Sequence, residues 1–144
     1  MPNSQTVLDL IRRAMESGDS ASMRQAFELL LGSGPETLSP AAEYEVRHED
    51  YVMEMPQSGE RIRGREAMRS MQEGFPNPPS VSIRRVVGAD RTWVLEGVND
   101  YGDDVWRVVD VLELASDGRI LRETRYYAQP FQAPEWRAPF VEGI

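Results

Sequence analysis

The sequence predicts an α+β domain in which helices cover one face of a curved antiparallel sheet. Helical periodicity is confined to about the first 75 residues, four strand-like segments follow residue 80, and only short turns separate these strands. A sheet curved over helices encloses a conical space, and such spaces usually hold a ligand. We therefore expect residues 1–128 to form one domain. Residues 129–144 form a tail expected to pack on the domain or on a partner subunit.

Three helices are expected in the N-terminal half. The first spans residues 4–17 behind a cap at Asn3 or Ser4. The second starts after the GDS stretch at residues 18–20 and stops at Gly32, and the third follows Gly64. Their buried faces are built from apolar residues at helical spacing: Val7, Leu8, Ile11, Ala14 and Met15, then Met23, Phe27, Leu30 and Leu31, then Met68, Met71 and Phe75.

Five strands are expected around these helices. The first runs from Tyr44 to Met55 and ends at Pro56, and a glycine-containing turn then leads into the third helix. The remaining strands span residues 81–87, 91–101, 105–114 and 119–128. The turns GAD, GDD and SDG between them are typical of antiparallel neighbours, so these four strands should form a meander.

Composition excludes several classes of function. The formal net charge of −8 argues against nucleic acid or an anionic membrane as partner, because both require a dominant basic face. The chain has no cysteine and a single histidine, which leaves little for a metal, and GERIRG lacks the pattern of a phosphate loop, so no cofactor is expected. No apolar run approaches the roughly 20 residues of a membrane span, and the first residues do not resemble a signal peptide. We expect a cytoplasmic protein.

Three motifs, together with the order of elements, resemble one family. They are SGD at residues 17–19, YVMEMPQSGERIRGREAM at residues 51–68 and DVLELASDGRI at residues 110–120. Together they resemble the SnoaL-like branch of the nuclear transport factor 2-like superfamily over about residues 5–128. The resemblance implies that superfamily's cone-shaped roll. It does not imply one activity, because the superfamily contains isomerases, dehydratases, cyclases, epoxide hydrolases and noncatalytic proteins.

Comparison with the ketosteroid isomerases of this superfamily tests one activity. Their catalytic base precedes the proline that ends the pocket strand, their oxyanion tyrosine lies on the first helix, and their neutral aspartic acid lies in a later strand. The matching positions here are Met55, Ile11 and Asp110. Methionine cannot take a proton and isoleucine cannot donate a hydrogen bond, so steroid-type isomerisation is not expected.

Asp110, Glu123 and Arg125 are the candidate catalytic residues. If Asp110 points inward among apolar neighbours, its carboxyl group should resist ionisation, which marks a candidate acid or base. The resemblance also turns Glu123 and Arg125 inward. It then implies the logic of the limonene-type epoxide hydrolases, with Asp110 as acid, Glu123 as the base that activates water, and Arg125 as the residue that holds both.

Two features of this cluster keep a structural alternative open. Those hydrolases carry their arginine two residues before the acid, at the position of Val108 here. Ion pairs are also common as purely structural features, so a network that only fixes the sheet is the alternative interpretation of Asp110, Glu123 and Arg125.

Aromatic and apolar side chains are expected to line the pocket and to bind a small, mostly apolar organic molecule. Ordinary core packing is the alternative for them. The opposite sheet face would present valines, an apolar strip that favours a homodimer through the outer face. The function is then either acid/base catalysis or noncatalytic ligand binding and dimerisation. The expected wall residues are Tyr51, Met53, Met55, Trp93, Asn99, Trp106 and Tyr127, and the outer strip is Val94, Val98, Val109 and Val111.

Overall fold

The structure is a computed structural model that describes residues 2–32 and 34–144. The helices are α1 (Ser4–Ser17), α2 (Ser20–Leu31), α3 (Pro40–Val46) and α4 (Arg65–Glu73), with a 3₁₀ helix η1 (Glu135–Phe140) in the tail. The strands are β1 (Arg47–Met55), β2 (Glu60–Arg63), β3 (Ser80–Ala89), β4 (Thr92–Asp100), β5 (Val105–Leu114) and β6 (Ile120–Ala128). None of the described helices is long and apolar enough to cross a membrane.

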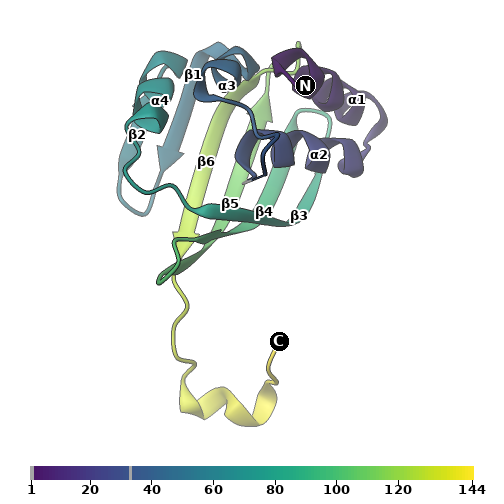
Figure 1. Cartoon of the computed structure of the whole chain (residues 1–144). Helices are drawn as coiled ribbons and strands as arrows, with labels where there is room; N and C mark the ends of the chain where they lie inside the picture. Colours follow the sequence, from purple (N-terminus) through teal and green to yellow (C-terminus); the bar gives the residue numbers. More distant parts are fainter. Residues whose placement is uncertain (1, 33) are drawn as a thin grey trace.

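All six strands form one curved, unclosed sheet with helices on one of its faces (Figure 1). The strand order is β2-β1-β6-β5-β4-β3. The last four strands form the expected antiparallel meander, and β1 joins β6 as its parallel neighbour. Helix α2 packs on β3, whereas α3 and α4 pack on β1. The α+β architecture expected from the sequence is confirmed.

The first two helices begin and end at the capping residues that the sequence predicted. The Asn3 side chain accepts a hydrogen bond from the Thr6 backbone N–H, and the Asp19 side chain accepts from the N–H groups of Ala21 and Ser22. Gly18 ends α1 in the left-handed region, at a φ of 71°, where a side chain would be strained. The short break between the two helices therefore follows directly from the SGD sequence.

Two elements differ from the expectation, so the first half has four helices rather than three. Residues 40–46 form α3, and the strand expected from Tyr44 begins only at Arg47. Ser39 caps this helix by accepting from the Ala42 N–H, and Pro40 occupies its first turn, which is a common helix start. The expected turn after Pro56 is instead a β-hairpin, in which β2 pairs with β1.

One continuous core lies between the helices and the inner face of the sheet. Trp93 on β4 is fully buried, and so are Phe27 and Met23 of α2 and Ile11 of α1. The Trp93 indole N–H donates to the Asp90 carbonyl oxygen at 3.0 Å, so its one polar atom is satisfied.

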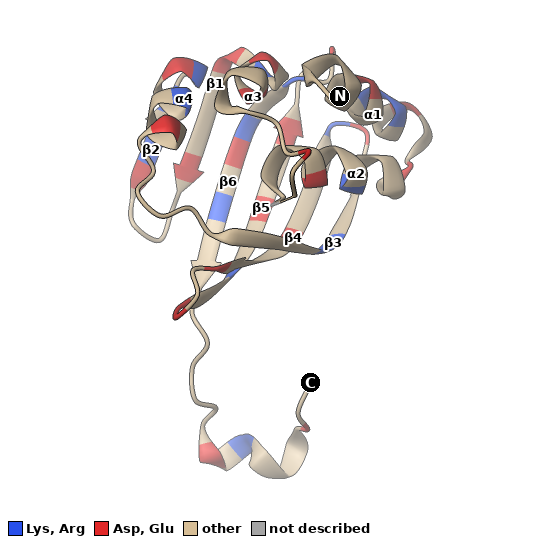
Figure 2. Ribbon diagram, in the orientation of Figure 1, with Lys and Arg blue, Asp and Glu red and all other residues tan. Residues whose placement is uncertain are grey.

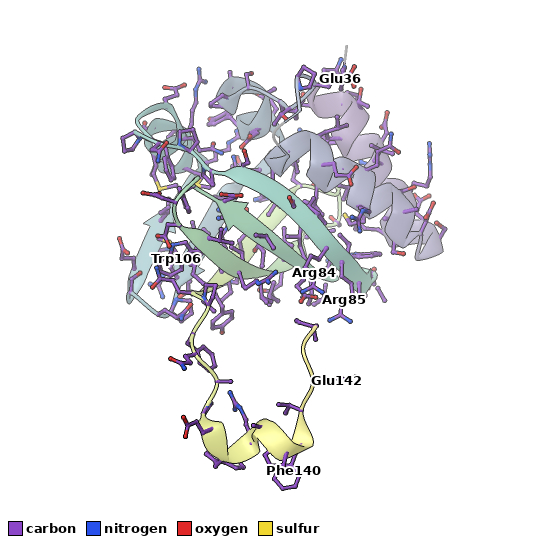
Figure 3. All side chains as sticks on the ribbon, turned by 60° about the horizontal axis from the view of Figure 1, so that its bottom comes forward. Glu36, Arg84, Arg85, Trp106, Phe140 and Glu142 are labelled. Atoms are coloured by element: carbon purple, nitrogen blue, oxygen red, sulfur yellow. The ribbon has the colours of Figure 1, made fainter. Side chains whose placement is uncertain are left out.

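The tail extends away from the domain beyond the end of β6 (Figure 1). Its large apolar side chains are exposed: Phe131 by 79%, Trp136 by 74% and Phe140 by 80%. Figure 3 shows Phe140 and Glu142 on this segment, well clear of the strands.

Replacing Trp93 by alanine should lower the free energy of unfolding by about 3–5 kcal/mol, because it empties a large volume in a closed core. The matched control is Trp136→Ala, which removes the same side chain from the exposed tail and should cost less than about 0.5 kcal/mol. Urea denaturation of both variants at low protein concentration measures this difference. Equal losses would contradict the core described above.

Candidate functional site

The strand register arranges the inward-facing side chains in rows across the sheet. In one row, Leu95 of β4 lies opposite Asp110 of β5, and Asp110 lies opposite Arg125 of β6. The neighbouring row pairs Leu112 with Glu123. Side chains in adjacent rows of one face lie within reach of each other. The sheet therefore brings Asp110, Glu123 and Arg125 together, the arrangement that the family resemblance implies.

A cavity of about 300 Å³ opens between the sheet and the helices, on the side of these rows nearer the end of β6. One part of its wall is apolar and is formed by side chains such as Met68, Met71 and Leu95. The other part is polar. The polar lining side chains are Thr37, Glu43, Gln72, Asn99, Tyr101, Asp110, Arg125 and Tyr127.

Arg125 holds the two carboxyl groups of the sheet. Its Nε donates to Glu123 Oε2 at 2.9 Å, its Nη2 lies 2.8 Å from the same oxygen, and its Nε lies 3.5 Å from Asp110 Oδ2. The Tyr51 hydroxyl donates to the second oxygen of Glu123, Oε1, at 2.8 Å. Both oxygens of Glu123 are therefore engaged. Figure 2 shows acidic and basic residues close together along β6.

A second group of polar side chains, which the sequence did not lead us to expect, extends this network to the helices. Arg47 donates through Nη2 to Glu43 Oε2 and through Nη1 to Gln72 Oε1, both at 3.2 Å, and Gln72 Nε2 donates to the same Glu43 oxygen. Arg47 Nε also lies 4.0 Å from Glu123 Oε1. Glu43, Arg47, Glu123, Arg125 and Asp110 thus form one continuous chain of charged groups.

The environment separates the pKa values of the three carboxyl groups. Burial raises the pKa of Asp110 well above its ordinary value, and the neighbouring Glu123 carboxylate raises it further, while Arg125 opposes both. Burial also acts to raise the pKa of Glu123, but Arg125, the hydrogen bond with Asp110, Arg47 and Tyr51 together lower it to about 2. Burial raises the pKa of Glu43 despite Arg47 and Gln72.

One proton explains the contact between the two carboxyl groups of the sheet. No described residue donates a hydrogen bond to the buried Asp110 Oδ1, although Asp110 and Glu123 are in hydrogen-bonding contact. A proton on Asp110 satisfies that contact, because a carboxyl O–H can donate to a carboxylate. Glu43 and Glu123 then balance Arg47 and Arg125, and the buried cluster is electrically neutral.

The expected pocket residues divide into two groups. Asp110, Arg125, Tyr127 and Asn99 line the cavity. The other expected residues do not, because alternation predicts which face a side chain occupies but not how far along the strand the helices cover that face. Tyr51, Met53, Trp93 and Glu123 are buried in the interior, Met55 packs against the core, and the Trp106 indole N–H donates to Asp104 Oδ2 at 2.8 Å.

No family model and no curated protein sequence matches the chain, but solved structures do. An NTF2-like protein of unknown function from Burkholderia xenovorans is 27% identical with a TM-score of 0.67, covering 98% of this chain and 94% of that one. A candidate ketosteroid isomerase from Kribbella flavida is 20% identical with a TM-score of 0.68, covering 97% of this chain and 90% of that one.

A third solved structure shares the fold over a shorter part of the chain. It is a hypothetical protein from Catenulispora acidiphila with a ketosteroid isomerase-like fold, in complex with trimethylamine. It is 15% identical with a TM-score of 0.54, covering 71% of this chain and 80% of that one. Together with the curved sheet and its helices, these similarities show that the chain has the fold of the nuclear transport factor 2-like proteins.

Proposed function

We propose that the protein is a SnoaL-like, cofactor-independent acid/base enzyme of the epoxide hydrolase, cyclase or isomerase kind, acting on a small, mostly apolar molecule in the cavity. The observation that carries this proposal is the state of Asp110. This residue is only 1% exposed, it lines the cavity, and burial beside Glu123 raises its pKa well above the ordinary value. A carboxyl group that keeps its proton at a cavity wall is suited to donate that proton to a ligand oxygen.

The cavity wall supports this class of ligand. Met68, Met71 and Leu95 offer apolar surface, whereas Asp110 and Arg125 lie together on the sheet. A volume near 300 Å³ corresponds to about ten water molecules in liquid water. A compact apolar molecule with one oxygen atom at its polar end would fit this cavity. Once Asp110 gives up its proton, Arg125, at 3.5 Å, stabilises the resulting carboxylate.

The geometry argues against the expected role of Glu123 as the base that activates water. Glu123 does not line the cavity, both of its oxygens accept hydrogen bonds, and a pKa of about 2 makes its carboxylate a weak base. In this proposal Glu123 is a positioning residue. It orients Arg125, and its charge keeps the proton on Asp110.

A noncatalytic binding protein is the second candidate function. The positions that match the base and the tyrosine of the ketosteroid isomerases are Met55 and Ile11, and Ile11 is buried in the core. Neither side chain can transfer a proton. In this second candidate the same cavity binds a ligand without changing it, and the buried charges only stabilise the sheet.

Asp110→Asn separates the two candidates. A panel of small epoxides and cyclisable ketones is screened for turnover with the wild-type protein, and every substrate found is repeated with the variant. Loss of the acid should lower the rate by about 10²–10⁴-fold, because general acid catalysis contributes that much. Asp104→Asn, a surface change beside Trp106, is the control and should leave the rate unchanged. Turnover that survives Asp110→Asn would remove Asp110 from the mechanism.

Replacing the two buried carboxyl groups by amides should have different effects on the free energy of unfolding at pH 7. Glu123→Gln should lower the free energy of unfolding by about 3–5 kcal/mol, because it removes the charge that pairs most closely with the buried Arg125. Asp110→Asn should not destabilise the protein, because the native Asp110 is already neutral and asparagine can still donate to Glu123. Denaturant titration of both variants measures the difference.

The dependence of stability on pH has a definite sign for each residue. The native state binds the Asp110 proton more tightly than the unfolded chain, so the wild-type protein loses stability as the pH rises from about 3.8 through the raised pKa. The wild-type protein bears this cost at neutral pH and the Asp110→Asn variant does not, so any gain in the free energy of unfolding of the variant should vanish near pH 3.8. The contribution of Glu123 is complete above pH 4.5 and is lost as the pH falls toward about 2. An Asp110→Asn variant that is less stable at every pH would contradict the neutral carboxyl group.

A homodimer through the outer sheet face is part of the proposal. Val87, Val109 and Tyr126 are exposed on that face, and a shallow hollow of about 190 Å³ lies among Arg85, Val87, Val94, Glu96 and Val109. The apolar side chains of the tail are exposed in the same molecule. A six-residue 3₁₀ helix is too short to persist alone in water, so we propose that a second copy covers the outer face and receives the tail.

Light scattering should give the mass of a dimer for the full chain. Deleting residues 129–144 should shift the protein toward monomer, because Phe131, Trp136 and Phe140 lose their contacts. Val109→Glu should do the same by burying a charge in the interface. A full chain that remains monomeric at high concentration would defeat the dimer. A dimer unaffected by the deletion would show that the tail does not cross.

A further inference from the structure

The helical side of the cavity carries a carboxyl group that the proposed function does not use. Glu43 of α3 is 5% exposed and lines the same cavity as Asp110. We infer that Glu43 is the general base that acts with Asp110, activating a water molecule that opens a small apolar epoxide. This inference rests on the proposed acid role of Asp110. It adds the catalytic residue that an engaged Glu123 cannot supply.

The hydrogen bonds that described side chains donate to Glu43 all go to one of its two oxygens. Arg47 and Gln72 both donate to Oε2. Neither of them holds Oε1. A carboxylate that is anchored through one oxygen keeps its orientation while the other oxygen accepts a proton, which is the geometry that a general base requires.

Among the described residues that line the cavity, only Glu43 and Asp110 have carboxyl groups. Glu43 Oε2 lies 3.2 Å from Arg47 Nη2, so Glu43 is the carboxylate of the pair and Asp110 is the acid. Burial raises the pKa of Glu43, and this makes it a stronger base than a glutamate in water. The positive charge of Arg125 acts on both carboxyl groups, and its Nε lies 3.5 Å from Asp110 Oδ2.

The two groups reach the cavity from opposite walls. Asp110 comes from the sheet, whereas Glu43 comes from the helical layer. Epoxide opening needs this separation, because the nucleophile must attack the carbon from the side opposite the departing oxygen. Acid and base pairs that act on a substrate with a water molecule between them are likewise held apart in other hydrolases.

The reaction balances with these two residues and water. Glu43 Oε1 takes one proton from water while the water oxygen forms a bond to an epoxide carbon. The bond between that carbon and the epoxide oxygen breaks, its electron pair goes to the oxygen, and the oxygen receives the proton of Asp110. The product is a vicinal diol. Transfer of the proton from Glu43 to Asp110 through solvent restores both residues.

The test uses styrene oxide as the probe and measures formation of phenylethane-1,2-diol. Glu43→Gln keeps the shape of the side chain and should lower the rate by at least about 10²-fold. Glu45→Gln, which removes an exposed carboxylate from the same helix, is the matched control and should leave the rate unchanged. Diol formation at the wild-type rate in Glu43→Gln would overturn the inference.

A second measurement distinguishes a base from a structural carboxylate and does not need the variant to fold. The wild-type rate should fall on the acid side of its pH profile, with an apparent pKa equal to that of Glu43 in a carbon-13 carboxyl NMR titration. A structural role for Glu43 predicts no such agreement. An acid limb that differs from the measured pKa of Glu43 would therefore also overturn the inference.

NMR with the same probe separates the two proposals. If styrene oxide shifts the signals of cavity residues such as Met68 and Met71 but no diol forms, the base assignment fails and the binding function stands. If the probe neither binds nor reacts, the inference fails, and the panel of epoxides and cyclisable ketones decides the proposed function. Diol formation that Asp110→Asn and Glu43→Gln each abolish, and that Glu45→Gln retains, supports both.

Discussion

The guanidinium groups of Arg47 and Arg125 and the carboxyl groups of Glu43, Asp110 and Glu123 lie close together between the sheet and helices α3 and α4. If all five groups were charged, this buried network would hold one unbalanced negative charge. Arg47 and Arg125 neutralise two of the carboxylates, so the third carboxyl group must keep a proton or face solvent. Asp110 is the one that keeps it, because the other two carboxyl groups accept strong hydrogen bonds: Tyr51 and Arg125 donate to Glu123, and Arg47 and Gln72 donate to Glu43. The chemistry of the cavity follows from this balance.

The same strands build a core at one end and a cavity at the other. On β4, Trp93 and Asn99 face the same side of the sheet, but Trp93 lies in the core whereas Asn99 lines the cavity. On β6, Glu123 is buried and Tyr127 lines the cavity. The charged row of Asp110 and Arg125 lies at the boundary between these regions. Its residues are therefore buried enough for shifted pKa values and still line the cavity, a combination that neither region offers alone.

Sequence patterns predicted one wall of the site and missed the other, for identifiable reasons. Period-two alternation and short turns fix the register of β5 and β6, so the meeting of Asp110, Glu123 and Arg125 was predictable. The depth of Trp93 and Met53 was not, because it depends on where the helices cover the sheet. Glu43 was missed because α3 has only seven residues, too few to show a helical period. The available signal was the pair Ser39 and Pro40, which marks a helix start and places Glu43 and Arg47 one turn apart.

A network that served only to stabilise the sheet would need one carboxyl group fewer. With an apolar residue or an asparagine in place of Asp110, the four remaining charges would still balance, and the cost of keeping a carboxyl group protonated above its ordinary pKa would disappear. Asp110 therefore makes the folded protein less stable at neutral pH than it needs to be. Residues that lower the stability of the fold at a cavity wall are typical of functional sites, where the needs of function outweigh those of stability. This physical argument favours catalysis over a purely structural role for the cluster, and it does so independently of any resemblance to known enzymes.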